Sequence, residues 1–389
     1  MAERPRYFWI GIALALSIGM ACTIAAVSSS RGGGDNGSGL PDVVSITSSA
    51  RSQPAGIPIG LDYGNTLYNA GAAKIAAGLD DAQKLGASWV RVDLPWDGVQ
   101  DTTTTAYDWS HFDELVTAAS SRGLRLLVTV VDPPAWARNP LCNTQESCEP
   151  ENPSAYAAFA AKAAARYAGS GVHDWEIWNE ENLGSFAVSK NPEAAYEKLL
   201  ADSYTAIHAA DSGALVMIGG LGMAQTDASQ GWIGAYDFLS GVALRGGLDY
   251  ADAVGVHPYD WNQMPTAAPE FTMIDETGRS LESILQKYGH SEMPFWITET
   301  GAPTSGSGKA ASTDSSGATH VTYNRQAQLA TATVAAETAD PHIKGLFWYT
   351  DTDLPANDLY FGLRTSSGKA KPAFAALQKA ITAYRASLK

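Results

Sequence analysis

The sequence is short of basic residues. Its 389 residues include 26 lysines and arginines against 41 aspartates and glutamates, which gives a formal net charge of -15. This charge would repel a phosphate backbone unless the few cations were tightly clustered, and the sequence contains no such cluster. We therefore expect no nucleic acid among the partners of this chain.

Signatures of metal and nucleotide binding are missing as well. No histidines stand at the His-x-His or His-Glu-x-x-His spacing that holds a catalytic metal, which disfavours a metal hydrolase. The turn after the first candidate strand, Gly60 to Asn65, is not the glycine-rich turn that binds a dinucleotide phosphate. We expect neither a metal nor an organic cofactor.

Apolar and aromatic residues, by contrast, are plentiful. Hydrophobic residues make up 45% of the chain, which is enough for a large core and excludes a disordered chain, a collagen and a small disulfide scaffold. The chain has 11 tryptophans but only 10 phenylalanines. An indole N–H needs a partner when it is buried, whereas the flat indole face suits the apolar face of a sugar ring. The excess of tryptophan is a weak indication of sugar binding.

The N-terminal segment predicts export. Arg4 and Arg6 precede an uncharged stretch from Tyr7 to Val27. At about 1.5 Å per residue this stretch is long enough to cross a hydrocarbon core of roughly 30 Å. A signal-anchor helix and a cleaved signal peptide fit it equally well, and Gly19 to Cys22 is an imperfect match to a lipoprotein signal. Each alternative exports the rest of the chain.

Composition divides the chain into three parts. Residues 1–28 form the export segment, residues 29–52 a glycine- and serine-rich linker that cannot bury enough surface to fold, and residues 53–389 one folded domain. We expect this domain to be a monomer that lies outside the cell or at its surface. Only the N-terminal segment is expected to contact the membrane.

Two of the three cysteines predict a disulfide. Cys22 lies in the export segment, whereas Cys142 and Cys148 stand six residues apart in a polar loop. In an exported protein such a pair is most simply a disulfide. The compartment disfavours two free thiols, and no histidine stands at ligand spacing from the pair to complete a metal site.

Eight short apolar runs alternate with helical stretches along the folded domain. The candidate strands start near Ile57, Ser88, Leu124, His173, Ala214, Ala253, Pro294 and Gly345. Candidate helices include 155–167, 192–209, 325–338 and a last one over 372–388. This alternation is typical of βαβ units and a parallel sheet.

Eight such units without a second compositional block predict one (β/α)8 barrel, the TIM-barrel fold. An open doubly wound sheet is the alternative, and the missing phosphate-binding turn counts against it. In a (β/α)8 barrel the active site lies at the carboxyl ends of the strands. Polar residues that end different strands should therefore meet in space.

Two glutamates end distant strands. Glu180 follows the fourth strand, and Glu299 ends the seventh, 119 residues later. Glycosidic cleavage needs such a pair, because one acid protonates the departing oxygen while a second carboxylate attacks or stabilises the anomeric carbon. The roles require different protonation states, so we expect a raised pKa for one glutamate and hydrogen-bond donors that keep the other ionised. Arg91 and Tyr259 are the candidate donors.

Three motifs lie at the strand ends. They are Glu-Ile-Trp-Asn-Glu at 176–180, His-Pro-Tyr at 257–259 and Trp-Ile-Thr-Glu-Thr-Gly at 296–301. Together they resemble the signatures of clan A retaining glycoside hydrolases, in particular the cellulase-like and family 39 branches. The resemblance implies double displacement, with Glu180 as general acid/base, Glu299 as nucleophile and Asn179 bound to a sugar hydroxyl. Retaining enzymes hold the two carboxyl groups about 5–5.5 Å apart, against about 6.5–9.5 Å in inverting enzymes, and we predict the shorter separation.

Two further glutamates share the first motif. Glu181 stands where the resembling family usually has proline, so it either raises the pKa of Glu180 or competes with it for the acid/base role. Strand-end geometry and the preceding asparagine favour Glu180. Glu176 lies four residues deeper in the strand, and we interpret it as a buried partner of Arg91 or of another barrel cation.

The remaining candidates are expected to contact substrate or order the glutamates. His257 and Tyr259 should order the nucleophile and the sugar hydroxyls, and the fixed fork of Arg91 suits holding a carboxylate. By the resemblance, Trp348 at the end of the eighth strand should form an aromatic platform beneath the reacting sugar. Further candidates for substrate contacts are Trp96, Trp136, Asp62 and Asp93, and more weakly Asp351 and Asp353.

Three functions remain open at this point. The leading one is hydrolysis of an extracellular or cell-surface polysaccharide or glycoconjugate. A transglycosylase would use the same residues with a sugar in place of water. A catalytically inactive carbohydrate-binding barrel is disfavoured because both carboxylates are present.

Overall fold

The computed structural model describes residues 55–101, 106–142, 148–259, 265, 279–309, 320–355 and 360–389. The expected export segment, residues 1–28, and the linker, residues 29–52, lie outside these ranges. Of the helices in the described ranges, none is both long and apolar enough to cross a membrane.

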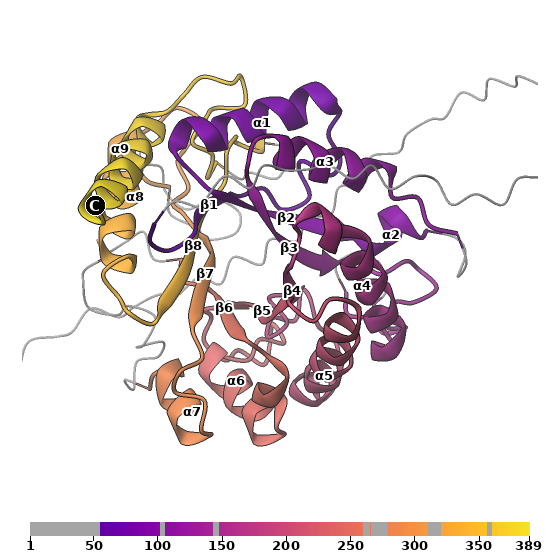
Figure 1. Ribbon diagram of the computed structural model, residues 1–389. Coiled ribbons are helices and arrows are strands. Elements are labelled where there is room, and N and C mark those ends of the chain that lie inside the picture. The colour runs from indigo at the N-terminus through magenta and orange to yellow at the C-terminus, as the bar shows by residue number, and fades with distance from the viewer. Residues whose placement is uncertain are drawn as a thin grey trace, which may run out of the picture.

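Eight parallel strands close into a barrel in the order of the sequence (Figure 1). They are β1 (Ile59–Asp62), β2 (Trp89–Pro95), β3 (Arg125–Val131), β4 (Asp174–Asn179), β5 (Leu215–Gly222), β6 (Ala253–His257), β7 (Phe295–Thr300) and β8 (Ile343–Tyr349). β1 pairs with β2 on one side and with β8 on the other, which closes the barrel. The predicted (β/α)8 barrel is confirmed, and each strand begins within two residues of its predicted start.

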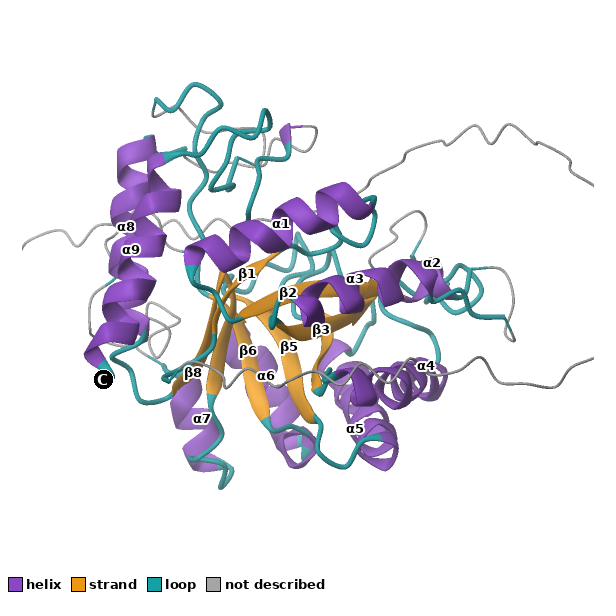
Figure 2. Cartoon of the chain, turned by 45° about the horizontal axis from the view of Figure 1, so that its top comes forward, coloured by secondary structure: helices purple, strands orange, loops and turns teal. Residues whose placement is uncertain are grey.

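Helices surround the barrel (Figures 1 and 2). They are α1 (Ala72–Leu85), α2 (Trp96–Val99), α3 (Ser110–Ser121), α4 (Pro153–Tyr167), α5 (Pro192–Ala210), α6 (Ala235–Leu244), α7 (Leu281–Lys287), α8 (Tyr323–Glu337) and α9 (Pro372–Ser387). The start of α4 illustrates how local sequence sets these bounds. Asn152 accepts hydrogen bonds from the N–H groups of Ser154 and Ala155, and Pro153 occupies the first turn, where its missing N–H is not needed.

Large side chains fill the barrel interior below the carboxyl ends of the strands. A buried cluster joins Trp89, Leu127, Met217, Ala253, Trp296 and Phe347, which come from six different strands. Glycines make room for the rings: a Cβ on Gly60 would lie 2.8 Å from the ring of Phe347, and one on Gly345 would overlap Trp296. This packed floor leaves only the carboxyl ends of the strands as a place for a site.

The loop after β3 carries the predicted disulfide. Cys142 and Cys148 are joined, and Cys148 is buried. Residues 143–147 between them lie outside the described ranges.

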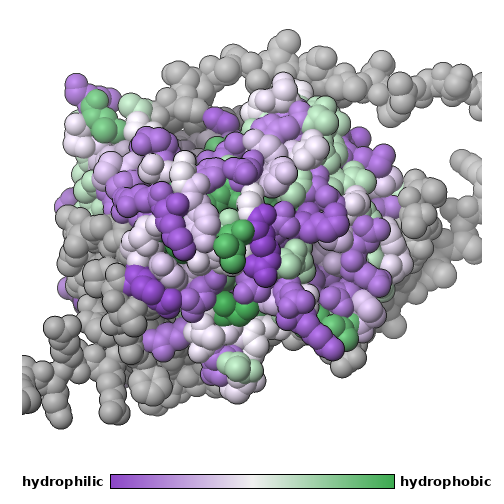
Figure 3. All heavy atoms as spheres, turned by 90° about the horizontal axis from the view of Figure 1, so that it is seen from below, coloured by the Kyte–Doolittle hydropathy of each residue, from purple (hydrophilic) through white to green (hydrophobic). Residues whose placement is uncertain are grey.

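The outer surface is mostly hydrophilic on the face seen from below Figure 1 (Figure 3). Hydrophobic residues on this face form separate spots among polar ones. Isolated exposed apolar residues of this kind are normal on a protein surface, and Leu244 at the end of α6, 71% exposed, is an example.

Candidate active site

Arg91 occupies the centre of the site. It lies on β2 and is only 1% exposed. Its Nε donates to Glu176 Oε2 at 2.6 Å, its Nη1 to Asp62 Oδ2 at 3.1 Å and to Glu299 Oε1 at 2.8 Å, and its Nη2 to Asn179 Oδ1 at 2.7 Å. The planar guanidinium therefore fixes side chains from β1, β4 and β7. Glu176 is the buried partner of Arg91, as its position in the strand suggested.

One histidine lies between the two glutamates. His257, at the end of β6, places Nδ1 3.1 Å from Glu180 Oε1 and Nε2 3.6 Å from Glu299 Oε1. Its Nε2 also lies 3.1 Å from the hydroxyl of Thr298. Tyr259 donates its hydroxyl to Glu299 Oε2 at 2.8 Å. Both glutamates thus approach a single imidazole and belong to one site.

Burial controls protonation here. It raises the pKa of Glu180 above the usual glutamate value, against a hydrogen bond with His257 that lowers it. It also raises the pKa of Asp62 to about 7. Burial lowers the pKa of His257, which favours a neutral imidazole near pH 7.

Glu299 differs from the expectation that donors would keep its pKa low. The donors are in place, because Arg91 and Tyr259 each bond one oxygen of the carboxylate. Burial nevertheless raises the pKa of Glu299, and the negative charge of Glu176 adds to the effect. The donors reduce this increase without reversing it.

Unusual backbone conformations accompany these side chains. Trp178 and Glu180 have left-handed φ angles of 70° and 47°, and Asp132 after β3 has a φ of 50°. Such angles cost non-glycine residues about 1 kcal/mol or more each and persist only where the surroundings enforce them. Because two of them flank Asn179, the regular alternation of the strand is broken, and Asn179 and Glu180 both line the site.

A hollow of about 610 Å³ lies at the carboxyl ends of the strands. Its lining brings together six of the residues singled out in the sequence: Asp62, Arg91, Asp93, Asn179, Glu180 and Glu299. It also includes Asn65, Asp132, Phe186 and Tyr349, which the sequence did not single out. Asp132 directly follows β3, so the rule that placed Asp62 and Asp93 there could have found it, whereas Asn65 lies three residues beyond the end of β1.

Trp348 does not line this hollow. Its side chain is 3% exposed and packs in the core that includes the helices around the barrel. Side chains alternate along a strand, so Phe347 fills the barrel interior and Tyr349 lines the hollow, while Trp348 faces outward. Tyr349, and not Trp348, is therefore the aromatic residue of β8 at the site.

The other two predicted tryptophans occupy different environments. Trp96 is 1% exposed, donates Nε1 to Gln100 at 2.7 Å and stacks on Phe159 with ring centroids 5.3 Å apart, which is core packing. Trp136, in the loop after β3, packs edge-on against Trp96 but is 40% exposed. Of the two, only Trp136 offers an accessible ring.

The two aspartates after β8, Asp351 and Asp353, are also not among the residues that line the hollow. Asp353 accepts a hydrogen bond from the buried ammonium of Lys371 at 2.6 Å, an ion pair that fixes the loop. Asp351 accepts from the hydroxyl of Thr352 at 3.0 Å, and burial raises its pKa to about 6.

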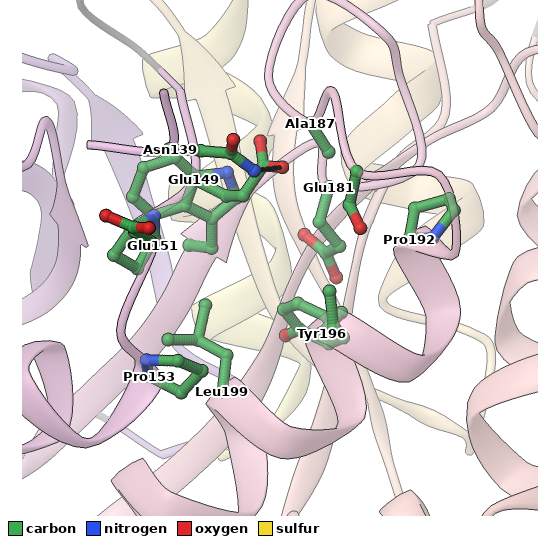
Figure 4. A pocket seen from close by; sticks show the side chains of 13 residues that line it. Asn139, Glu149, Glu151, Pro153, Glu181, Ala187, Pro192, Tyr196 and Leu199 are labelled. Atoms are coloured by element: carbon green, nitrogen blue, oxygen red, sulfur yellow. Dashed lines mark hydrogen bonds between the residues drawn. The ribbon is translucent and has the colours of Figure 1, made fainter. Parts of the chain in front are cut away.

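Glu181 points away from Glu180. It is 2% exposed and lines a second cavity of about 590 Å³ together with Tyr196 and Glu149 (Figure 4). Burial raises the pKa of its carboxyl group well above the usual value. Glu181 therefore lies outside the first hollow, which Glu180 lines.

Potential metal ligands cluster at one place in the described ranges. They are Cys142, Cys148 and Glu149, and the two cysteines are joined in the disulfide. Glu149 instead accepts hydrogen bonds from Asn139 Nδ2 and from the N–H of Val188, each at 2.8 Å. These contacts tie the loop after β3 to the segment that follows Glu180.

Comparison with known proteins agrees with the geometry. The model of the family "Cellulase (glycosyl hydrolase family 5)" matches residues 52–339, most of the chain. The chain belongs to this family. The resemblance to clan A, through its cellulase-like branch, is thereby confirmed.

Solved structures share the fold of this family 5 chain. A GH5_18 enzyme from Streptomyces cattleya, in complex with GlcNAc, gives a TM-score of 0.62 at 20% identity and covers 85% of this chain and 81% of its own. A family 39 glycoside hydrolase from Bacteroides cellulosilyticus gives 0.59 at 19% identity, over 85% of this chain and 64% of its own.

Among curated proteins, a glucan 1,3-beta-glucosidase from Candida albicans is 28% identical over 118 residues. The match covers 30% of this family 5 chain and 38% of the relative. The match therefore spans well under half of that relative's length.

Proposed function

We propose that this protein is a retaining glycoside hydrolase that cleaves a polysaccharide or glycoconjugate outside the cell or at its surface. One observation carries the proposal: Glu180 and Glu299 end different strands, line one hollow and both approach His257. Membership of a glycosyl hydrolase family supports it.

In the first step Glu299 attacks the anomeric carbon while Glu180 gives its proton to the departing oxygen. A carbon–oxygen bond to Glu299 forms as the glycosidic bond breaks. The raised pKa of Glu180 suits this step, because the acid stays protonated at a pH where an ordinary glutamate has ionised.

In the second step the carboxylate of Glu180 takes a proton from water, and the water oxygen displaces Glu299 from the anomeric carbon. Glu299 leaves as a carboxylate, and Arg91 and Tyr259 bond its two oxygens. These donors stabilise the charge that returns to Glu299. Two displacements at one carbon restore its original configuration.

Asn179 and Tyr349 would contact the sugar. Arg91 bonds Asn179 Oδ1, which orients the amide so that Nδ2 is the group left to donate toward a sugar hydroxyl. Tyr349 replaces Trp348 as the ring of β8 beside the reacting sugar. The exposed ring of Trp136 suits a more distant sugar unit.

The extracellular location rests on two supports. The N-terminal segment has the pattern of an export signal, and the Cys142–Cys148 disulfide is typical of an oxidising compartment. Fractionation of cells that express the full chain tests this. Recovery of the folded protein from the cytoplasm alone would contradict it.

The activity is tested by screening aryl β-glycosides and cell-wall polysaccharides, followed by NMR of the first-formed anomer. We expect the configuration of the substrate in the product; the inverted anomer would exclude double displacement. Glu299→Gln should abolish turnover, whereas Glu114→Gln, on the exposed face of α3, is the matched control. Hydrolysis by Glu299→Gln would refute the assignment, and products of transfer to an added sugar would instead indicate a transglycosylase.

A further inference from the structure

The strand that presents Glu180 loses its regular pairing just before the site. Ile177 pairs with Val130 of β3 and with Ile218 of β5, and pairing with β5 resumes only at Asn179. Between them lies Trp178, whose left-handed backbone turns the chain out of the ladder. Buried backbone groups on both sides of β4 therefore need other partners.

Tyrosine hydroxyls supply these partners at both edges of β4. On the β3 side, the hydroxyl of Tyr156 donates to the carbonyl of Val130 at 2.6 Å and accepts from the N–H of Trp178 at 3.3 Å. On the β5 side, the hydroxyl of Tyr196 donates to the carbonyl of Ile177 at 2.9 Å and accepts from the N–H of Gly219 at 2.8 Å. Each hydroxyl thus bridges two strands as one donor and one acceptor.

The two tyrosines come from neighbouring helices and are almost fully buried. Tyr156 lies on α4 and is 0% exposed, and Tyr196 lies on α5 and is 4% exposed. Figure 4 shows Tyr196 beside Glu181 in the second cavity. The backbone approaches closely here, since a Cβ on Gly219 would lie 2.5 Å from Glu181 Oε2 and 2.7 Å from the carbonyl of Trp178. No side chain could replace the hydrogen atoms of Gly219 without displacing this end of β4.

We propose that Tyr156 and Tyr196 are positioning residues, whose hydroxyls hold the end of β4 so that Asn179 and Glu180 point into the hollow. The inference rests on the proposed function, because it assumes that Glu180 is the acid/base. Neither tyrosine lines the hollow; the hydroxyl of each bonds the backbone of β4, and the ring of Tyr156 also packs edge-on against Trp178. If a tyrosine lost its hydroxyl, the carbonyl and the N–H that the hydroxyl bonds would be buried without partners. The end of β4 would then relax toward regular pairing.

The test compares Tyr156→Phe and Tyr196→Phe with Tyr167→Phe. Tyr167 is also buried on α4, but its hydroxyl donates to Asp113 and does not contact β4. Each variant is assayed on one substrate with a poor leaving group, which needs the acid, and on one with an activated leaving group, which hardly does. General acids contribute on the order of 10²–10⁴-fold, so a misplaced Glu180 should cost at least about tenfold on the poor leaving group and much less on the other.

Equal losses on both substrates, or the same pattern in Tyr167→Phe, would show that the tyrosines serve stability alone and would overturn the proposal. Glu180→Gln keeps this outcome apart from failure of the proposed function. If Glu180→Gln shows no dependence on the leaving group, the acid/base assignment itself is wrong. If it shows the dependence and the tyrosine variants do not, only the positioning role is refuted.

A measurement on the unaltered protein covers the case in which the variants do not fold. Residue-resolved hydrogen exchange should find the N–H groups of Trp178 and Gly219 protected as strongly as the ladder of β4, because the tyrosine hydroxyls accept from them. Rapid exchange of either amide in the folded protein would contradict the proposal.

Discussion

Stability should fall between pH 5 and pH 8, and Asp62 should carry a large share of the change. Burial raises the pKa of Asp62 from 3.8 to about 7, against the opposing effect of Arg91. A group whose pKa is raised on folding stabilises the fold while it is protonated. That contribution is complete below pH 3.8, the ordinary pKa of an aspartate in an unfolded chain, and is lost as the pH rises through about 7.

The magnitude follows from proton linkage. One pKa unit corresponds to about 1.4 kcal/mol, and between pH 5 and pH 8 the shift of Asp62 acts over roughly two units, so the expected loss is about 2–3 kcal/mol. Asp174 and Asp351, whose pKa values burial raises to about 6, add smaller losses of the same sign.

Urea denaturation of the wild type and of Asp62→Asn at pH 5 and pH 8 measures how much of the loss of stability is due to Asp62. The variant cannot ionise at this position, so its stability relative to the wild type should improve by about 2 kcal/mol from pH 5 to pH 8. Asp202→Asn is the control. Burial raises the pKa of Asp202, but hydrogen bonds from Ser154 and Lys198 and the charge of Lys198 together outweigh burial and lower it, so Asp202 is ionised at both pH values. If Asp62→Asn shows the same pH dependence as the wild type, Asp62 is already ionised at pH 5 and the reasoning fails.

Other predictions concern the roles of single residues. Glu181→Gln imitates a neutral acid and should keep nearly full kcat/KM, whereas Glu180→Gln should lose about 10²-fold or more on a substrate with a poor leaving group; equal losses would reopen the choice between them. Tyr349→Ala should raise KM for substrate while Trp348→Phe mainly lowers the melting temperature, and steady-state kinetics with thermal unfolding would reveal the opposite pattern. His257→Leu removes a hydrogen bond that lowers the pKa of Glu180, so the alkaline limb of the pH–rate profile should move to higher pH; a shift to lower pH would contradict this.

The barrel could be read from the sequence because its strands are short apolar runs separated by helices of conventional length. The observed β4, for example, begins at Asp174, one residue from the expected start. The convergence of Arg91, Glu180 and Glu299 followed from the same pattern, since strand ends meet in a closed parallel barrel whatever their separation in the chain. Fold topology therefore placed the charged centre without any knowledge of side-chain contacts.

The direction in which each side chain points was harder to predict from the sequence. β8 is buried on both faces apart from Lys344, so its apolar run carries no alternation that would distinguish Trp348 from Tyr349. In β4 the alternation itself is interrupted, because Trp178 adopts a left-handed conformation that a bulky residue rarely takes. Sequence periodicity assumes regular strands and so fails where a functional strand end departs from them.

The interruption of β4 has a physical origin. The end of β4 must aim Asn179 and Glu180 into one hollow, whereas a regular strand would turn adjacent side chains to opposite faces. The departure leaves backbone groups unpaired, and the hydroxyls of Tyr156 and Tyr196 from two different helices accept and donate in their place. These replacement hydrogen bonds join residues far apart in the chain, so no local sequence pattern around Trp178 predicts them. The strained conformation at the end of β4 persists only because the helices that enclose the barrel pack against it.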